Sequence, residues 1–460
     1  MSPSFITDKL HALRKYFDTG VTKPYRFRKK QLQSLKHAIL KYEKEIVAAL
    51  YTDLKKSAEE GYASETGLVL ADINLALKNL RNWMQPRYTA TDLVNIPSGS
   101  KIYRDPLGIV LIIAPWNYPL QLILMPLIGA IAGGNCAVLK PSEFAPATAA
   151  IIEKIISEIF PADYIAVVNG DGAEVVPSMM KNFRFDHVFY TGSIPVGKAV
   201  YMMAAEQLVP VTLELGGKSP AIVDADANLT IAAKRIILGK FINAGQTCIA
   251  PDYVLVHDAI RDKFVGKLKE TITKFYTDNP ESSYDYGRII NTRRFDKLIS
   301  YIGSGKIVTG GRHDRSKLYI APTVLEDVSL ESPVMTEEIF GPILPLIGFH
   351  TTSEAIKIVE HNPNPLAFYL FSGNKKTQRE WIEKVSFGGG CINNADWHFT
   401  NHYLPFGGVG NSGMGAYHGK YTFNTLTREK PVMKTPNWFD PSIKYPPMKG
   451  RLKLFKWFIR

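Results

Sequence analysis

One cysteine and one carboxylate stand in short blocks whose neighbours favour chemistry over packing. Cys248 ends the small polar turn Gly245-Gln-Thr-Cys248, and Glu214 stands just before the pair Gly216-Gly217. A thiolate is a strong nucleophile near neutral pH, and a nearby carboxylate can take a proton from a thiol or from water. A lone cysteine is more often a buried small hydrophobe, and a strand-end acid is often merely exposed. Because the turn is a poor site for a core-filling thiol, the two blocks favour a nucleophilic cysteine with a carboxylate base.

Three further blocks suit an oxyanion or a nucleotide. Asn117, in Ala114-Pro-Trp-Asn-Tyr-Pro119, offers an amide N–H that donates without titrating, although a loop asparagine is ordinary by default. Lys140-Pro-Ser-Glu143 follows a candidate strand at the carboxyl end, where open α/β sheets bind ligands. Gly192-Ser-Ile-Pro-Val-Gly197 follows a later strand and opens a helix, whose N–H groups and dipole suit a pyrophosphate. A Gly-x-x-x-x-Gly string alone is a weak indication.

The spacing of apolar residues predicts the elements that position these blocks. Helical spacing runs over 31–54 and 63–83, and the polar, strand-like stretch 87–104 predicts an arm or hairpin outside the main body. From Gly108 onward short buried strands alternate with helices, which is typical of a parallel, helix-covered sheet. The predicted strands are 109–113, 137–139, 165–168, 187–190, 221–223, 253–256, 343–345 and 368–371, and the predicted helices between them are 120–132, 145–160 and 196–206. We therefore predict an α/β fold.

Length, cysteine content and charge restrict the class of protein. A chain of 460 residues predicts about two to three domains. Its three cysteines are too few for a disulfide framework, and we interpret Cys136 and Cys391 as structural. No secretory signal or membrane-spanning run is visible, so we expect a cytoplasmic protein. The net charge of +12 comes without a recognition motif, so we do not expect nucleic-acid binding.

Taken together, these blocks resemble the aldehyde dehydrogenase superfamily. The two most specific matches are Glu214-Leu-Gly-Gly-Lys218 and the turn that ends at Cys248, and Glu337-Glu-Ile-Phe-Gly-Pro342 is another. The resemblance covers the chain up to about Arg428. The chain is most similar to the class 3 branch, which includes fatty and aromatic aldehyde dehydrogenases. Three segments carry this similarity: Cys248-Ile-Ala-Pro-Asp-Tyr253, Asn411-Ser-Gly-Met-Gly415 and Tyr417-His-Gly-Lys420.

The resemblance implies a role for each candidate residue. Cys248 is the nucleophile, Glu214 activates the deacylating water, and Asn117 shares the developing oxyanion with the backbone N–H of Cys248. Lys140 and Glu143 hold the adenosine ribose, Glu338 holds the nicotinamide ribose, and Phe340 backs the nicotinamide ring. The cofactor site is completed by Trp116, Gly192, Ser193 and Gly197. Either NAD or NADP fits this set, because Glu143 would repel a 2′-phosphate and Lys140 would attract one.

The implied architecture is a Rossmann-type nucleotide domain, a related α/β catalytic domain and a small bridging arm, assembled as a homodimer. We expect the nucleotide domain in residues 1–86 and 104–210 and the catalytic domain in 211–392. We expect the arm, together with a segment of the substrate tunnel, in residues 87–103 and 393–430. Residues 431–460 should form a basic amphipathic tail.

The implied reaction oxidises an aldehyde, medium- or long-chain aliphatic or aromatic, to a carboxylic acid through a cysteine thiohemiacetal and a thioester. A coenzyme-A-acylating enzyme of the same fold is one alternative, and Glu214 argues against it because that branch typically lacks the base. A catalytically silent binding protein is the other, but nucleophile, base and oxyanion donor are all present.

Histidines near the end of the chain raise the question of a metal. His398 and His402 stand four residues apart, with Asp396 before them and His418 beyond. Since no other ligand type clusters with them at suitable spacing, we predict no metal site and interpret the histidines as a polar rim of the substrate tunnel.

The C-terminal residues 450–460 combine basic and aromatic side chains. At 100° per residue Lys453, Lys456 and Arg460 share one narrow arc, and apolar side chains cover the rest, with Arg451 the exception. Such a helix suits an anionic membrane surface, so we expect a possible peripheral contact there. Packing of the tail on its own body or across a dimer is the alternative.

Overall fold

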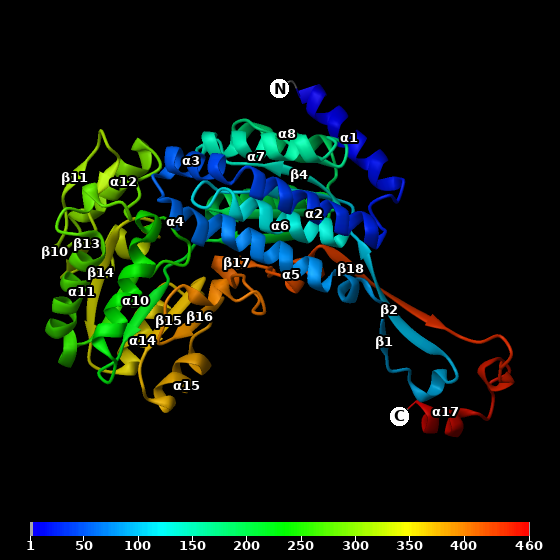
Figure 1. The fold of residues 1–460 in the computed structure, drawn as a ribbon. Helices are drawn as coiled ribbons and strands as arrows, with labels where there is room; N and C mark the ends of the chain where they lie inside the picture. The colour runs from blue at the N-terminus through cyan, green and yellow to red at the C-terminus, as the bar shows by residue number, and fades with distance from the viewer. Residues whose placement is uncertain (1–2, 460) are drawn as a thin grey trace.

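Two helix-covered α/β units and a projecting arm make up the molecule (Figure 1). The structure is a computed structural model, and it describes residues 3–459. The arm extends away from both units, and the C-terminal end of the described chain lies near the tip of the arm.

The first unit is built on a six-stranded sheet with the order β17-β7-β6-β3-β4-β5. All neighbouring strands are parallel except β17, which pairs with β7 antiparallel. The strands are β3 (Ile109–Ile113), β4 (Cys136–Lys140), β5 (Ile165–Val167), β6 (His187–Gly192), β7 (Val211–Leu215) and β17 (Gly413–Met414). Every residue of β3 and β4 is buried, as expected for a parallel sheet with helices on both faces.

The helices that belong to this unit come mostly from the first half of the chain. They are α1 (Pro3–Asp18), α2 (Tyr25–Lys41), α3 (Glu43–Leu54), α4 (Ala58–Gly61), α5 (Gly67–Met84), α6 (Gln121–Gly133), α7 (Pro146–Ile159), α8 (Gly172–Asn182), α9 (Ile194–Ala205) and the late α16 (Lys420–Thr425). A π-helical turn, η1 (Tyr62–Thr66), joins α4 to α5.

The second unit is built on a seven-stranded sheet with the order β10-β13-β14-β9-β8-β15-β16. The strands are β8 (Pro220–Val223), β9 (Tyr253–His257), β10 (Lys306–Thr309), β13 (Thr323–Glu326), β14 (Ile343–Phe349), β15 (Ala367–Phe371) and β16 (Gly389–Ile392), with a separate hairpin of β11 (His313–Asp314) and β12 (Tyr319–Ile320). Its helices are α10 (Leu229–Phe241), α11 (Arg261–Tyr276), α12 (Thr292–Ile302), α13 (Pro333–Thr336), α14 (Thr352–Glu360) and α15 (Lys375–Lys384). Only β10 runs antiparallel to its neighbour.

The arm is a three-stranded antiparallel sheet with the order β1-β2-β18. β1 (Arg87–Thr89) and β2 (Gly99–Pro106) form the hairpin that the sequence predicts, and β18 (Thr427–Lys434) pairs with β2 along its whole length. The strand β18 was not predicted. Beyond it lies the short helix α17 (Leu452–Phe458), close to the arm.

The carboxyl ends of three neighbouring strands carry the candidate blocks. Asn117 lies in the loop after β3, Lys140 ends β4, and Gly192 ends β6. From β3 the chain moves to β4 and β5 on one side and returns to β6 on the other, so the sheet order reverses here. Open parallel sheets bind ligands at this kind of switch point.

The α/β prediction is confirmed, and two details differ. The helix predicted over 31–54 is two helices, because the backbone of Tyr42 leaves the helical region at φ −98°, ψ 12°. The boundary predicted at residues 210 and 211 separates β7 from its own sheet. Because β7 pairs in parallel with β6, the change of sheet falls between Leu215 and Pro220.

Candidate active site

The Cys248 turn follows α10 in an unusual backbone conformation. Asn243, Ala244 and Gly245 all have positive φ, at 52°, 51° and 75°. A Cβ on Gly245 would lie 2.3 Å from the carbonyl oxygen of Gly341, so only glycine fits there. This strained turn lifts Cys248 out of the helix path and places it on a cavity wall.

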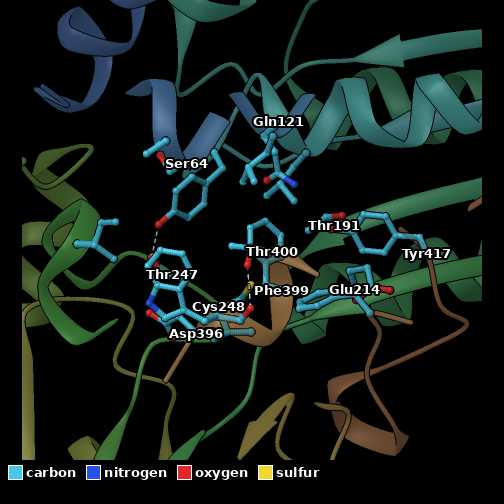
Figure 2. A pocket seen from close by; sticks show the side chains of 18 of the residues that line it. Ser64, Gln121, Thr191, Glu214, Thr247, Cys248, Asp396, Phe399, Thr400 and Tyr417 are labelled. Carbon is cyan, nitrogen blue, oxygen red and sulfur yellow. Dashed lines mark hydrogen bonds between the residues drawn. The ribbon is translucent and has the colours of Figure 1, made fainter. Parts of the chain in front are cut away.

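The cavity has a volume of about 290 Å³ and lies between the two α/β units (Figure 2). Tyr118 and Gln121 line it from the first unit, and Cys248 lines it from the second. The segment that follows β16 closes another side, with Asp396 and Phe399 among its lining residues. Glu214 lines the same cavity, so nucleophile and base candidates are brought together.

Glu214 is a buried carboxyl without a hydrogen-bond partner. It lies on β7, opposite Thr191 of β6 and Gly413 of β17, and neither of its oxygens accepts a hydrogen bond from the described residues. Burial raises its pKa well above the usual range. An unpaired buried carboxyl is costly to stability, which is typical of a group retained for reaction.

The Cys248 thiol is also held in its protonated form in this environment. Burial raises its pKa, and the charges of Glu338, Glu214 and Asp396 raise it further. The surroundings of Cys248 therefore disfavour the thiolate in the cofactor-free protein.

Asn117 lies behind the cavity wall, with an exposed fraction of 2%. Its Nδ2 donates to the carbonyl oxygen of Gln246 at 3.0 Å, two residues before Cys248. Asn117 is thus tied to the cysteine turn, but it is not among the residues that line the cavity. Its neighbour Tyr118 does line the cavity and makes a 2.6 Å hydrogen bond to the hydroxyl of Thr247.

The ribose candidates form an ion pair at the end of β4. Lys140 Nζ lies 2.9 Å from Glu143 Oε2, and the other Glu143 oxygen accepts from the N–H of Gly172 at the start of α8. Burial alone would raise the pKa of Glu143, but the hydrogen bonds from Lys140 and Gly172 bring the net value below its usual range. Glu143 is therefore an ionised acceptor, which suits a ribose hydroxyl.

The glycine-containing loop after β6 has the geometry expected of an anion site. Gly192 ends β6, and Ser193 is the N-cap residue of α9 but makes no side-chain capping hydrogen bond. The N–H groups of Ile194 and Val196 therefore remain available to an anion, whereas Pro195 has none and the N–H of Gly197 donates to the carbonyl oxygen of Ser193. Gly197 lies inside α9, where a Cβ would come within 2.5 Å of Leu215, so it brings the helix close to β7.

Glu338, Phe340 and Trp116 meet at the other side of this region. A Cβ on Gly216 would lie 1.9 Å from Glu338 Oε2, so the carboxyl occupies space that glycine leaves open. Burial and the charge of Asp252 raise the pKa of Glu338 to about 8. The rings of Trp116 and Phe340 make an edge contact at 5.3 Å between centroids.

The chain as a whole matches the aldehyde dehydrogenase family model over residues 7–432. It is 47% identical over 459 residues to 4,4'-diaponeurosporen-aldehyde dehydrogenase of Staphylococcus aureus, covering 99% of this chain and 100% of that protein. It is 45% identical over 425 residues to aldehyde dehydrogenase family 3 member A2 of Macaca fascicularis, covering 92% of this chain and 87% of that protein. The chain belongs to the aldehyde dehydrogenase family.

Solved structures of aldehyde dehydrogenases agree with this assignment. The substrate-bound state of Staphylococcus aureus AldH superposes with a TM-score of 0.97 at 47% identity, over 98% of this chain and 99% of that chain. An NAD-dependent aldehyde dehydrogenase from Sinorhizobium meliloti gives a TM-score of 0.87 at 29% identity, over 96% of this chain and 88% of that chain. The chain is also similar to glyceraldehyde-3-phosphate dehydrogenase GapN from Methanocaldococcus jannaschii in complex with NADP, with a TM-score of 0.85 at 27% identity over 95% of this chain and 95% of that chain. The chain is an NAD(P)-dependent aldehyde dehydrogenase that oxidises aldehydes to carboxylic acids.

The histidines of this aldehyde dehydrogenase do not form a polar rim. His418 is buried, neither ring nitrogen has a hydrogen-bond partner, and burial lowers its pKa to about 3. Its ring stacks on Phe406 at 5.1 Å. His398 lies 3.7 Å from the Cys391 sulfur, and none of the three histidines lines the cavity. Among residues 3–459, no cluster of three ligand-type side chains could hold a metal.

Several cavity residues escaped the sequence interpretation. Tyr118 lies in the same block as Asn117, so proximity in sequence could have indicated it. Phe399 and Tyr417 lie far from every catalytic block in sequence, and only the fold brings them to the cavity.

A separate observation concerns membranes. In the part of the chain that the structure describes, every helix is too short or too polar to cross a bilayer.

Proposed function

We propose that this aldehyde dehydrogenase works through a covalent thioester on Cys248, with Glu214 as the base that releases it. One observation carries the proposal: the thiol and an unpartnered, buried carboxyl line the same cavity. The Asn117 amide gives one N–H to the carbonyl oxygen of Gln246 in the cysteine turn, and its second N–H is the side-chain donor to the oxyanion, together with the backbone N–H of Cys248.

The proposed reaction has two halves. The Cys248 thiol loses its proton to solvent water, its sulfur bonds to the aldehyde carbon, and the carbonyl oxygen becomes an oxyanion that Asn117 stabilises. A nicotinamide held by Glu338, Phe340 and Trp116 would supply the hydride acceptor that this carbon needs to become a thioester. Glu214 then takes a proton from water, the water oxygen attacks the thioester carbon, and the carbon–sulfur bond breaks to release the acid.

We assign the cofactor contacts to the groups at the carboxyl ends of the strands. Lys140 and Glu143 would hold the adenosine ribose, and the Gly192–Gly197 loop with Ser193 would hold the pyrophosphate at the start of α9. Glu338, Phe340 and Trp116 would hold the nicotinamide ribose and ring. The uncapped first turn of α9 and the space beside Gly216 support this assignment.

The cavity wall supports a medium- or long-chain aliphatic or aromatic aldehyde. Aliphatic and aromatic side chains together make up most of it, including Leu68, Leu122, Leu238, Ile242 and Phe406. Apolar walls favour apolar substrates because burial removes hydrocarbon from water. The relative from Staphylococcus aureus is named for 4,4'-diaponeurosporen-aldehyde, and that name supports including this compound in a substrate panel.

The decisive assay measures reduction of NAD and of NADP over aldehydes from short aliphatic to long-chain and aromatic, with product analysis. We expect carboxylic acid as product and a higher kcat/KM for longer or aromatic aldehydes. Added coenzyme A distinguishes the alternative, since an acylating enzyme would yield a thioester product and depend on the thiol. If none of the aldehydes yields a carboxylic acid, the proposal is contradicted.

We also propose the division of the chain and its assembly. The six-stranded unit is the nucleotide domain and the seven-stranded unit is the catalytic domain, with the arm as the bridge of a homodimer. The exposed outer strand β18 supports the last point, since within residues 3–459 only β2 pairs with it, and Val432 and Met433 are 41% and 50% exposed. Unpaired strand edges are templates for pairing with another chain. Sedimentation equilibrium of the full chain tests the dimer.

We propose that the protein is cytoplasmic and makes peripheral contact with a membrane. The helix α17 carries Lys453 and Lys456, both exposed, and its apolar Leu452 is 64% exposed. Arg451, the exception to the basic arc, donates to the carbonyl oxygens of Ser442, Ile443 and Tyr445, so it serves the preceding turn. Arg460 and the side chain of Phe458 lie outside the described residues.

A further inference from the structure

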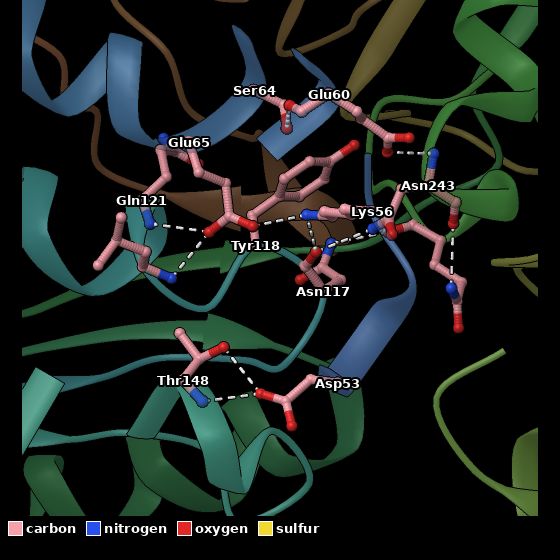
Figure 3. Close-up of polar contacts among 12 residues, drawn as sticks. Asp53, Lys56, Glu60, Ser64, Glu65, Asn117, Tyr118, Gln121, Thr148 and Asn243 are labelled. Atoms are coloured by element: carbon pink, nitrogen blue, oxygen red, sulfur yellow. Dashed lines mark hydrogen bonds and ion pairs between the residues drawn. The ribbon is translucent and has the colours of Figure 1, made fainter. Parts of the chain in front are cut away.

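A fully buried ion pair lies directly behind the loop that carries Asn117 (Figure 3). Lys56 Nζ is 2.6 Å from Glu65 Oε1, and both side chains have an exposed fraction of 0%. Neither residue lines the cavity or takes part in the reaction proposed above. The pair comes from the segment between α3 and α5, while Asn117 follows β3.

The lysine of the pair holds Asn117 and its neighbour. Lys56 Nζ donates to the backbone carbonyl oxygen of Asn117 at 2.9 Å, and it lies 3.9 Å from the centre of the Tyr118 ring. The same carbonyl oxygen accepts a second hydrogen bond, 2.8 Å long, from the side-chain amide of Asn243. Asn243 belongs to the strained turn before Cys248, so two separate segments fix this one peptide group.

The glutamate of the pair holds the other end of the same loop. Glu65 Oε2 accepts from the backbone N–H groups of Leu120 and Gln121, at 2.8 and 3.2 Å, where α6 begins. Negative charge is favoured at a helix N-terminus. Glu65 itself lies in the π-helical turn η1, and such turns occur frequently at functional sites.

The two ends of the pair therefore clamp the five residues 117–121 from behind. On the cavity side, Asn117 bonds to the oxygen of Gln246, and Tyr118 bonds to the hydroxyl of Thr247, the residue before Cys248. Of the two proposed oxyanion donors, the Asn117 amide thus belongs to the clamped loop, and the Cys248 N–H follows Thr247, which that loop contacts.

Stability alone does not account for a charged pair at this position. Removing two charges from water is costly, and well-packed apolar residues of the same size often give equal or greater stability. What a charged pair adds is direction, because Lys56 and Glu65 together fix four groups of one short loop at defined angles.

We propose that Lys56 and Glu65 are positioning residues for the oxyanion step, acting through Asn117 and the Tyr118–Thr247 contact. The inference rests on the proposed function, since it requires that Asn117 and Cys248 stabilise the oxyanion. The inference adds to the proposed catalytic residues two positioning residues that touch neither substrate nor cofactor.

The first experiment compares Lys56→Met, Glu65→Gln and wild type in rapid-mixing measurements of the NADH burst with a saturating aldehyde. We expect the burst rate to fall about 10- to 100-fold, because a misplacement of about 1 Å can cost 10²-fold. The dissociation constant of NADH should change less than about twofold. Hydrolysis of the thioester should slow as well, because attack of water on the thioester carbon forms an oxyanion at the same donors. The matched control is Arg28→Met, which removes a buried cation that donates to the Ala132 carbonyl oxygen near the other end of α6. It should lower the melting temperature and leave the burst rate of the folded enzyme unchanged.

The second experiment separates positioning from stability. In Lys56→Met/Glu65→Leu both buried charges are gone, so the melting temperature should recover relative to Lys56→Met while the burst stays slow. This double variant also replaces Lys56→Met if that variant fails to fold. In an Asn117→Ala background, Lys56→Met should slow the burst much less than in wild type, because the group it positions is absent.

Two results would overturn the inference. One is a burst rate that recovers together with the melting temperature, and the other is a full additional loss in the Asn117→Ala background. A wild-type enzyme without aldehyde oxidation would instead overturn the proposed function, so the two failures are distinguishable.

Discussion

Glu214 and Cys248 reach one cavity from two different sheets. Glu214 lies on β7 of the six-stranded sheet, and Cys248 lies in the loop that leads from α10 to β9 of the seven-stranded sheet. Their relative position therefore depends on how the two α/β units pack, and a small shift between the units would separate base from nucleophile.

Replacement of Cys248 by alanine should abolish aldehyde oxidation, because the covalent step is lost. Binding of NAD(P) should remain close to wild type, since no proposed cofactor contact is removed. Steady-state kinetics and fluorescence titration with the reduced cofactor measure the two effects. A near-native kcat in the alanine variant would show that the nucleophile is misassigned.

Replacement of Glu214 by glutamine should slow deacylation more than hydride transfer, because only the water-activating base is removed. Rapid mixing should show a burst of NADH followed by a slow steady state. If the burst disappears together with the steady state, Glu214 acts on the Cys248 thiol as well. Glu158→Gln, on the surface of α7, is the matched control and should behave as wild type.

The pH dependence of thiol reactivity follows from the raised pKa of Cys248. Burial is the main cause, and the Glu214 and Glu338 charges add to it, so alkylation by iodoacetamide should accelerate as pH rises into the alkaline range. Glu214→Gln removes one like charge near the thiol, which lowers the pKa and moves this acceleration to lower pH. The rate of inactivation of the cofactor-free protein by iodoacetamide, measured as a function of pH for wild type and Glu214→Gln, tests the direction of this pKa change. A shift to higher pH would show that Glu214 favours the thiolate, and no shift would show that Glu214 does not influence the thiol; either result would contradict this prediction.

Sequence reasoning succeeded where local pattern decides structure. The β-branched run of Ile109–Ile113 has no stable place except a buried strand, and the block after each such strand indicates where ligands bind. The turn at Cys248 could be recognised because Gly, Gln and Thr fill a core poorly.

Contacts between distant segments could not be predicted in this way. Lys56 touches Asn117 across 61 residues, and β18 pairs with β2 across more than 300, so neither leaves a local pattern. The same limit applies to His418, whose polarity indicates a rim although its aromatic neighbours bury it. Asn117 shows a finer limit, since its block was recognised but its position behind the cavity wall depends on the packing around it.

The C-terminal tail gives the last prediction. Lys453 and Lys456 are exposed on α17, and the apolar Leu452, Trp457 and Ile459 are 64%, 68% and 70% exposed. Basic side chains are attracted to anionic lipid, and apolar side chains gain by entering the interface, so the full chain should sediment with vesicles that contain phosphatidylserine.

A variant that ends at Lys449 should remain in the supernatant, and added salt should release the full chain, because screening weakens the attraction. Lys453→Glu/Lys456→Glu keeps the length and the apolar side chains, so it tests charge alone and should bind weakly. Because the tail lies near the tip of the arm, its loss should leave turnover of a short, water-soluble aldehyde unchanged and lower turnover only for an aldehyde presented in vesicles. Equal sedimentation of the full and shortened chains would reject membrane contact and leave packing of the tail on the protein or across the dimer.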